Sequence, residues 1–89
     1  MGVDKQNPKL QRIAQAADEA GVSKQRLQYY LMVGLVEPTE RSASGQQFFD
    51  NKAIERIRLV KELNESGYPL REIRQIFLRR EREKSLKTE

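Results

Sequence analysis

One short segment gathers most of the side chains that could do chemistry, and the chemistry they offer is binding. Lys24, Arg26 and Tyr29 can donate hydrogen bonds, and two glutamines, Gln25 and Gln28, lie between them. Cationic and hydroxyl groups bind phosphate oxygens, whereas a glutamine amide can contact the edge of an adenine through two hydrogen bonds. On one face of a helix, this mixture is typical of a surface that reads a DNA duplex. A solvated polar face is the plainer interpretation.

The sequence has few side chains suited to catalysis or metal binding. The chain has no histidine and no cysteine, which removes the commonest general base, thiol nucleophiles and the commonest metal ligands. No glycine-rich loop precedes a Lys-Ser or Lys-Thr phosphate clamp, and no nucleophile is paired with a base. The carboxylates fall on predicted helix exteriors, where we expect ordinary pKa values. The sequence therefore predicts a binding protein without a cofactor or a metal, and not an enzyme.

Length and charge agree with one small binding domain. Eighty-nine residues suffice for a single domain, and 37% hydrophobic with 34% charged residues fits a polar helical fold. The net charge of +4 comes from residues 51–89, because residues 1–50 hold six basic and six acidic side chains. A sequence pI near 9.6 favours a nucleic-acid partner. No segment approaches the roughly 20 apolar residues of a membrane span, so we expect a cytoplasmic protein with no membrane partner.

Two short helices joined by a tight turn must position the polar face. Apolar residues spaced by three and four predict a helix over 10–20. Gly21 suits its left-handed C-cap, and Ser23 suits the N-cap of a second helix over 24–33. Helices joined by only three residues must cross steeply, which is a helix–turn–helix. The required small, glycine and apolar positions are filled by Ala17, Gly21, Val22, Leu27 and Tyr30. An ordinary αα-hairpin is the alternative.

The next segment predicts a two-stranded hairpin, or wing. Extended segments at 35–38 and 47–49 flank a loop over 39–46, and Pro38 limits the first strand to an edge. Phe49 is predicted to be buried and Phe48 partly exposed, because strand residues alternate. The candidate contacts to the DNA backbone or minor groove at the wing tip are Arg41, Ser42, Ser44 and Gln46. A plain surface loop is the alternative.

Two further helices follow the wing. Asp50 suits the N-cap of a helix over 51–65, and another helix is predicted to start near Leu70. Arg58, Lys61 and Arg71 are expected around the turn between these helices, which could contact phosphates as a second wing. Residues 79–84 can continue the last helix as an exposed face. We therefore predict a flexible arm at 1–9, a domain at 10–78 and a charged, fraying tail at 79–89.

A longer pattern runs through all of these elements. Its residues are Ile13, Ala17, Gly21-Val22-Ser23, Leu27, Tyr29-Tyr30, Gly34-Leu35-Val36, Pro38, Arg41, Gly45, Phe49, Ile54, Ile57, Leu63, Gly67, Leu70, Glu72 and Ile73. The pattern resembles the MerR-type winged helix–turn–helix regulators over roughly residues 12–78. The resemblance implies a mainly α fold with about four helices and a two-stranded wing. It also implies sequence-specific binding of double-stranded DNA in transcriptional regulation.

The sequence departs from this family at three places. Gln28 stands where the family has an arginine before the tyrosine pair. The wing reads Gly45-Gln46-Gln47-Phe48-Phe49 where the family reads Gly-Tyr-Arg-x-Tyr, and Pro69 replaces the usual serine or threonine cap. Two cationic backbone clamps are thus replaced by neutral amides, so we expect lower phosphate affinity there and base reading by Gln28.

Partners and alternatives follow from the same comparison. The candidate DNA-binding residues are Ser23, Lys24, Gln25, Arg26, Gln28, Tyr29, Arg41, Ser42, Gln46, Gln47, Lys61 and Arg71. MerR-type regulators carry a long dimerisation helix and a sensor segment beyond this region, so we expect no small-molecule ligand in this chain. RNA polymerase or a second copy is the further partner that such a regulator would contact. An excisionase-like architectural factor and a protein-interaction module, favoured by the neutral first half, are the alternatives.

Overall fold

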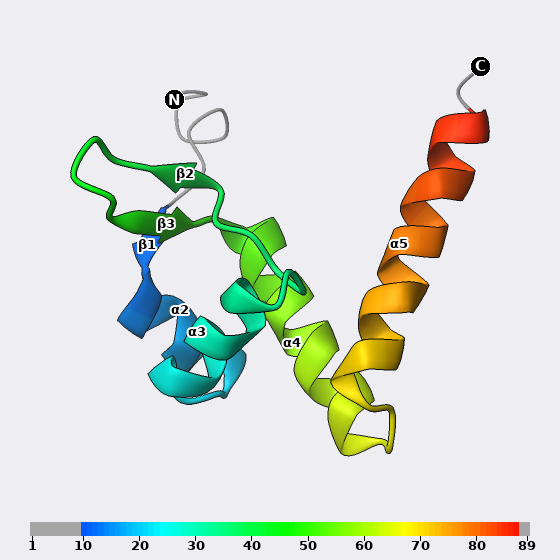
Figure 1. Ribbon diagram of the computed structural model, residues 1–89. Helices are drawn as coiled ribbons and strands as arrows, with labels where there is room; N and C mark the ends of the chain where they lie inside the picture. The colour runs from blue at the N-terminus through cyan, green and yellow to red at the C-terminus, as the bar shows by residue number, and fades with distance from the viewer. Residues whose placement is uncertain (1–9, 88–89) are drawn as a thin grey trace, which may run out of the picture.

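The computed structural model describes residues 10–87, with side chains as far as residue 82, as four helices and one small sheet. The elements in chain order are β1 (Gln11–Arg12), α2 (Ile13–Ala20), α3 (Lys24–Met32), β2 (Glu40–Arg41), β3 (Gln47–Phe49), α4 (Asn51–Glu65) and α5 (Leu70–Lys87). The sheet lies at one end of α2, and α5 leans away from the body beyond its turn with α4 (Figure 1). The winged helix–turn–helix fold is confirmed. The arm predicted at 1–9 and the last two residues lie outside the described part.

The turn between α2 and α3 has the predicted geometry. Gly21 ends α2 in the left-handed conformation, with φ of +80°, and the Val22 N–H donates to the Ala17 carbonyl at 3.0 Å. The Ser23 hydroxyl then accepts a hydrogen bond from the Arg26 N–H at 3.0 Å and caps α3. Both caps satisfy backbone groups that a helix end leaves unpaired. The chain can therefore reverse direction within three residues.

The core lies where α2, α3 and the sheet meet α4 and the first half of α5. Three alanines on α2 are buried and let that helix contact both α3 and α4 closely. Tyr30 and Phe49 are both buried, as predicted, while Phe48 is half-buried. The buried residues are Ala16, Ala17, Ala20, Leu27, Tyr30, Leu35, Val36, Phe49, Ile54, Ile57, Val60, Ile73 and Phe77. No charged side chain is buried within the described part, so apolar packing holds these elements together.

The start of the first helix was predicted wrongly. Gln11 and Arg12 form an edge strand instead, and pair antiparallel with Phe49 and Phe48. The sheet order is β1-β3-β2, so the sheet has three strands where two were expected. The pairing involves residues nearly forty positions apart, and it satisfies backbone groups that a helix over 10–20 would have used internally. Leu10, expected on the apolar stripe, is 36% exposed.

The first strand of the wing was also misplaced. It spans Glu40–Arg41 and pairs with Gln47 and Phe48, whereas residues 35–38 form an irregular connection. Leu35 and Val36 are consecutive and both buried, which a strand with one solvent face does not allow. Pro38 has no N–H to donate, so the ladder begins after it, with the Thr39 N–H donating to the Phe48 carbonyl at 2.8 Å.

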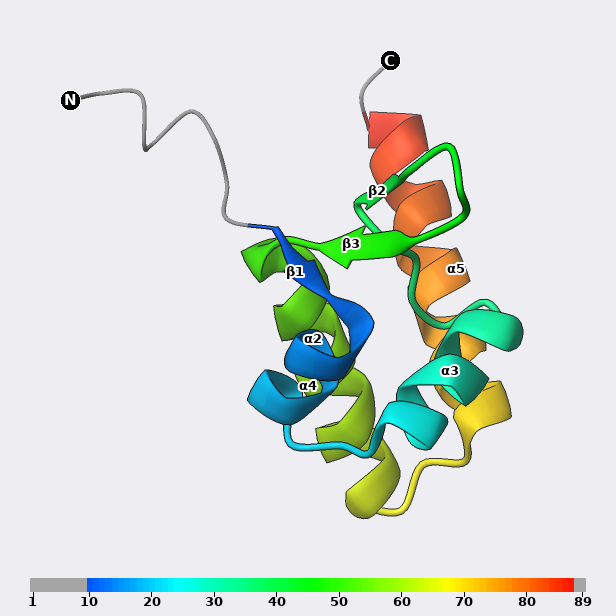
Figure 2. The ribbon, with the colours of Figure 1, turned by 90° about the vertical axis from the view of Figure 1, so that its left-hand side faces the viewer.

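The last helix runs farther than the domain boundary predicted at residue 78. α5 continues through Lys87, and its second half projects beyond the body, as Figures 1 and 2 show. Four apolar residues of this helix were predicted to be buried: Leu70, Ile73, Ile76 and Phe77. Ile73 and Phe77 are buried and Leu70 packs partly buried against the core, whereas Ile76 is half-buried. The charged run after Phe77 consists mostly of good helix formers, which accounts for the helix continuing past the last apolar positions.

Asp50 corrects the expectation that the carboxylates keep ordinary pKa values. Its Oδ1 accepts a hydrogen bond from the Ala53 N–H at 2.9 Å and caps α4. This bond, with a smaller contribution from the Thr39 side chain, lowers the pKa of Asp50 below its ordinary 3.8, although burial opposes the shift. The Asp50 N–H donates to Thr39 Oγ1 at 2.9 Å, so the same residue ties the wing to α4.

Replacing Asp50→Ala should lower the free energy of unfolding by about 1 kcal/mol near pH 7. A carboxylate whose pKa is lowered on folding stabilises above its unfolded pKa, and this contribution is lost as the pH falls through the folded pKa. The difference between the two proteins, measured by urea denaturation, should therefore shrink once the pH is lowered below 3.8, the ordinary pKa of this carboxyl. Asp50→Asn is the matched control, because it caps without ionising. An equal cost at both pH values would show that ionisation of Asp50 contributes nothing.

Candidate nucleic-acid interface

The predicted polar face of α3 lies on the surface. Leu27 and Tyr30 are buried, while the five polar side chains of the segment, Lys24, Gln25, Arg26, Gln28 and Tyr29, are all exposed. The two adjacent tyrosines separate clearly, because Tyr29 is 47% exposed and Tyr30 only 1%. The helix thus presents amides, two cations and a phenol to a partner while its opposite face is anchored in the core.

The first turn of α3 carries charge that works against the helix itself. Lys24 and Arg26 lie there, and the turn holds no acidic residue. Cations near a helix N-terminus oppose the helix dipole by about 0.3–1 kcal/mol each, so this arrangement does not stabilise the fold. With an anion in front of the helix, the same charges and the free N–H groups act together. Lys24 and Arg26 therefore reduce the stability of α3 but make its N-terminal end positively charged.

Ser42 shapes the tip of the wing instead of presenting its hydroxyl outward. Its Oγ accepts a hydrogen bond from the Gln46 N–H at 3.1 Å and lies 3.0 Å from Ser44 Oγ. The Ser42 N–H also donates to the Gln46 carbonyl at 2.9 Å. Ser42 is half-buried, whereas Arg41 and Gln46 are exposed, and Gln47 is half-buried on β3. The wing thus offers one cation and one amide, held by a structured loop.

The cations expected around the second turn are divided between two places. The Arg58 guanidinium donates to the Glu19 carbonyl at 3.1 Å, at the end of α2. Lys61 is half-buried, lies 3.7 Å from Glu65 Oε2, and its Cε and Nζ are 3.7 Å from the position a Gly21 Cβ would occupy. Both side chains therefore lie beside the helix–turn–helix, Arg58 at the end of α2 and Lys61 next to Gly21.

Arg71 lies elsewhere, beside Tyr29. A groove of about 580 Å³ separates the last turn of α3 from the first turns of α5, and the two helices lie one behind the other in Figure 2. It is lined by Tyr29, Val33, Pro69, Leu70, Arg71, Glu72 and Arg74. Two candidate residues from distant parts of the sequence thus border one surface feature.

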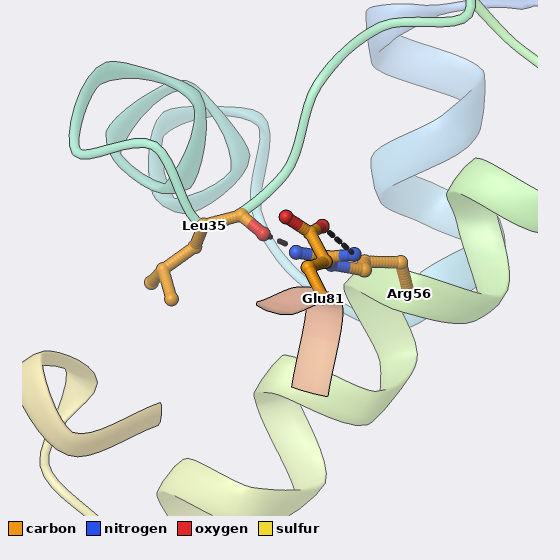
Figure 3. Close-up of polar contacts among 3 residues, drawn as sticks. All are labelled: Leu35, Arg56 and Glu81. Carbon is orange, nitrogen blue, oxygen red and sulfur yellow. Dashed lines mark hydrogen bonds and ion pairs between the residues drawn. The ribbon is translucent and has the colours of Figure 1, made fainter. Parts of the chain in front are cut away.

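The sequence analysis missed Arg56, which joins three elements. Its Nε donates to the Leu35 carbonyl at 3.1 Å, and its Nη1 lies 3.9 Å from Glu81 Oε2 (Figure 3). Its guanidinium carbon also lies 4.0 Å from the centre of the Phe77 ring. One feature of the sequence could have indicated this role. Arg56 lies on α4 beside the apolar stripe of Ala53, Ile57 and Val60, where a long side chain can contact neighbouring elements.

Tyr30 contributes packing rather than chemistry. Its hydroxyl is buried and has no hydrogen-bond partner in the part of the chain that the structure describes. Burial raises the pKa of Tyr30, while the nearby Arg26 opposes the shift. The phenol therefore stays protonated at neutral pH. Among the described residues, no three histidine, cysteine or acidic side chains gather as metal ligands. None of the helices in residues 10–87 has the length and hydropathy needed to cross a bilayer.

Comparison with known proteins decides the family. Residues 11–79 match the family described as MerR HTH family regulatory protein. The chain belongs to this family. It is 34% identical over 62 residues to the mercuric resistance operon regulatory protein of Bacillus cereus, covering 70% of this chain and 47% of that protein. It is 33% identical over 63 residues to the nodulation protein NolA of Bradyrhizobium elkanii, covering 71% of this chain and 29% of NolA. The chain thus spans half or less of the length of these relatives.

Solved structures of other transcription regulators share the fold. HiNmlR, a MerR family regulator lacking the sensor domain and bound to promoter DNA, superposes with a TM-score of 0.70 at 26% identity, over 76% of this chain and 52% of that one. The N-terminal part of the multidrug transporter activator of Bacillus subtilis, MtaN, gives a TM-score of 0.69 at 25% identity, over 75% of this chain and 63% of that one.

Substitutions of Ser23 separate its capping role from any role at the interface of this MerR domain. Ser23→Ala removes the acceptor for the Arg26 N–H and should lower the free energy of unfolding by about 1 kcal/mol. Ser23→Asp keeps the cap and should restore stability, because a carboxylate is favourable at a helix N-terminus. The added negative charge should nevertheless weaken binding to a mixed-sequence duplex, measured by fluorescence anisotropy. Wild-type affinity in Ser23→Asp would mean that this end of α3 faces away from phosphate.

Proposed function

We propose that this chain is the DNA-binding domain of a transcriptional regulator and binds double-stranded DNA sequence-specifically. α3 would lie in the major groove, and the wing, residues 40–49, would contact the flanking backbone. The observation that carries the proposal is the exposed polar face of α3, which begins with two cations and no acidic residue in a MerR-family fold. The promoter complex of HiNmlR, a structural neighbour, supports it.

The division of labour follows from which side chains are exposed. Lys24, Arg41 and Arg71 are exposed cations suited to phosphates. Gln25, Arg26 and Gln28 would supply most of the sequence preference, because amide and guanidinium groups make bidentate contacts with adenine and guanine edges. A single copy cannot read a site with two-fold symmetry, so a second copy is the proposed further partner, with RNA polymerase as the partner of the bound regulator.

Phosphate contacts should make binding steeply salt-dependent. If about five phosphates are neutralised, the logarithm of the binding constant should fall with the logarithm of salt concentration at a slope of about −4 to −5. The probe is the duplex most enriched by selection from a randomised library, titrated by anisotropy at several salt concentrations. A slope near zero, or a library from which no duplex is enriched, would contradict the proposal.

Arg26→Ala should weaken binding to the enriched duplex by about 1–3 kcal/mol and relax the preference at one base pair. Arg79→Ala is the matched control, because it removes the same charge from the exposed far half of α5. Repeating the library selection with each variant shows whether a single position loses its preference. An equal loss for every duplex would instead assign Arg26 to the backbone.

Amide chemical shifts distinguish this proposal from an interaction module on the same fold. Adding mixed-sequence duplex at low salt should shift the amide signals of residues 24–29 and those of the wing. Unchanged signals at 24–29 would favour the interaction module. For an architectural factor, circularly permuted probes would show strong bending of the bound duplex.

A further inference from the structure

The segment that joins α3 to the wing is anchored by backbone hydrogen bonds at its two ends, from the N–H groups of residues 33–35 and of Thr39. It runs from residue 33 to residue 39 without regular secondary structure, and it fixes the distance between the two elements proposed to touch DNA. The Leu35 N–H donates to the Tyr30 carbonyl at 2.9 Å, and the side chains of Leu35 and Val36 are buried. The Leu35 carbonyl accepts the Arg56 hydrogen bond at 3.1 Å. Arg56 therefore holds the middle of the connection through a charged donor.

The three contacts of Arg56 differ in strength. The bond to the Leu35 carbonyl is partly buried and directional. The stack on the Phe77 ring lies well within the range of a cation–π interaction. The contact with Glu81 is long, at 3.9 Å, and the Glu81 side chain is 63% exposed, so it adds little in water. The loop is therefore linked to α5 mainly by the hydrogen bond from Arg56 to the Leu35 carbonyl and by the stacking of Arg56 on Phe77.

α5 also supports the end of α3 directly. The Arg74 Nε lies 3.3 Å from the position that a Gly34 Cβ would occupy, and α5 forms one wall of the groove beside Tyr29 and Val33. Gly34 has φ of +81°, so it combines a left-handed turn with this close approach. The chain leaving α3 is thus contacted by two arginines in succession, with Arg74 beside Gly34 and Arg56 bonded to Leu35.

We propose that Arg56 is a positioning residue for DNA binding. By tying the Leu35 carbonyl to α5, it fixes the wing relative to α3, so that both elements reach the same duplex. Arg56 itself does not touch DNA in this arrangement. The inference rests on the proposed function, and it predicts that the wing loses its fixed position, while the core stays folded, when this donor is removed.

The geometric test uses the free protein. The sequence has no cysteine, so Ala43→Cys on the wing tip with Met32→Cys at the exposed end of α3 gives a clean pair for spin labels. Arg56→Met keeps an apolar chain over Phe77 but cannot donate, and it should broaden the distance distribution between the labels. Arg56→Lys, which keeps a cationic donor, should restore part of the narrow distribution. Glu81→Gln is the matched control and should leave the distribution unchanged. An unchanged distribution in Arg56→Met would overturn the proposal.

The binding test uses the duplex enriched by the wild-type chain. Arg56→Met should bind about tenfold more weakly at a temperature where thermal unfolding shows it to be fully folded. Its hydroxyl-radical footprint should lose the protection on the wing side and keep that over the major groove. Wild-type affinity, or a loss explained by the unfolded fraction alone, would overturn the proposal. If the wild-type chain enriches no duplex while the spin-label distances still broaden, the tether stands and the proposed function fails.

Discussion

The arrangement of this domain depends on the steep crossing of α2 and α3, which a three-residue turn enforces. Gly21 adopts a left-handed backbone that other residues reach only with strain, and Ser23 restarts the chain as a helix two residues later. Because the turn is so short, the buried alanines of α2 share one core cluster with Leu27 and Tyr30 of α3. The polar side chains on the remaining face of α3 are exposed, and only its last turn borders the groove shared with α5.

The parts predicted correctly from the sequence are those that depend on neighbours along the chain. The caps at Gly21, Ser23 and Asp50 have local backbone reasons, and the buried face of α3 follows from the spacing of Leu27 and Tyr30. The errors concern contacts between distant residues. β1 forms because Phe48 and Phe49 provide a strand edge with which it can pair. The sequence of residues 10–20 contains nothing that indicates this distant partner. The same is true of Arg56, whose partners come from two other elements.

The site shows the same division between local and distant effects. Its central face could be predicted, because exposure on a helix follows directly from periodicity. Which of the cations are exposed and which are engaged by other groups could not be predicted, because this depends on packing between distant elements. Arg58 and Lys61 are taken up by the end of α2 and by Glu65, whereas Arg71 lies beside Tyr29. Not every cation is therefore free to meet a partner, because a backbone carbonyl engages Arg58 and a carboxylate engages Lys61.

The small number of cations on α3 and the wing would affect the affinity of such a domain for DNA differently from its sequence specificity. Arginines that the family places before the tyrosine pair and in the wing are Gln28 and Gln47 here, and neither amide can release a counterion from a phosphate. In the proposed mode of binding, the non-specific part of the affinity would be weakened, while amide contacts to base edges would be kept. Reading base edges with both elements would require the helix and the wing to keep a fixed separation along the duplex. With fewer cations to compensate for misalignment, the rigidity of the connection at Leu35 would matter more to this chain than to a relative with stronger phosphate clamps.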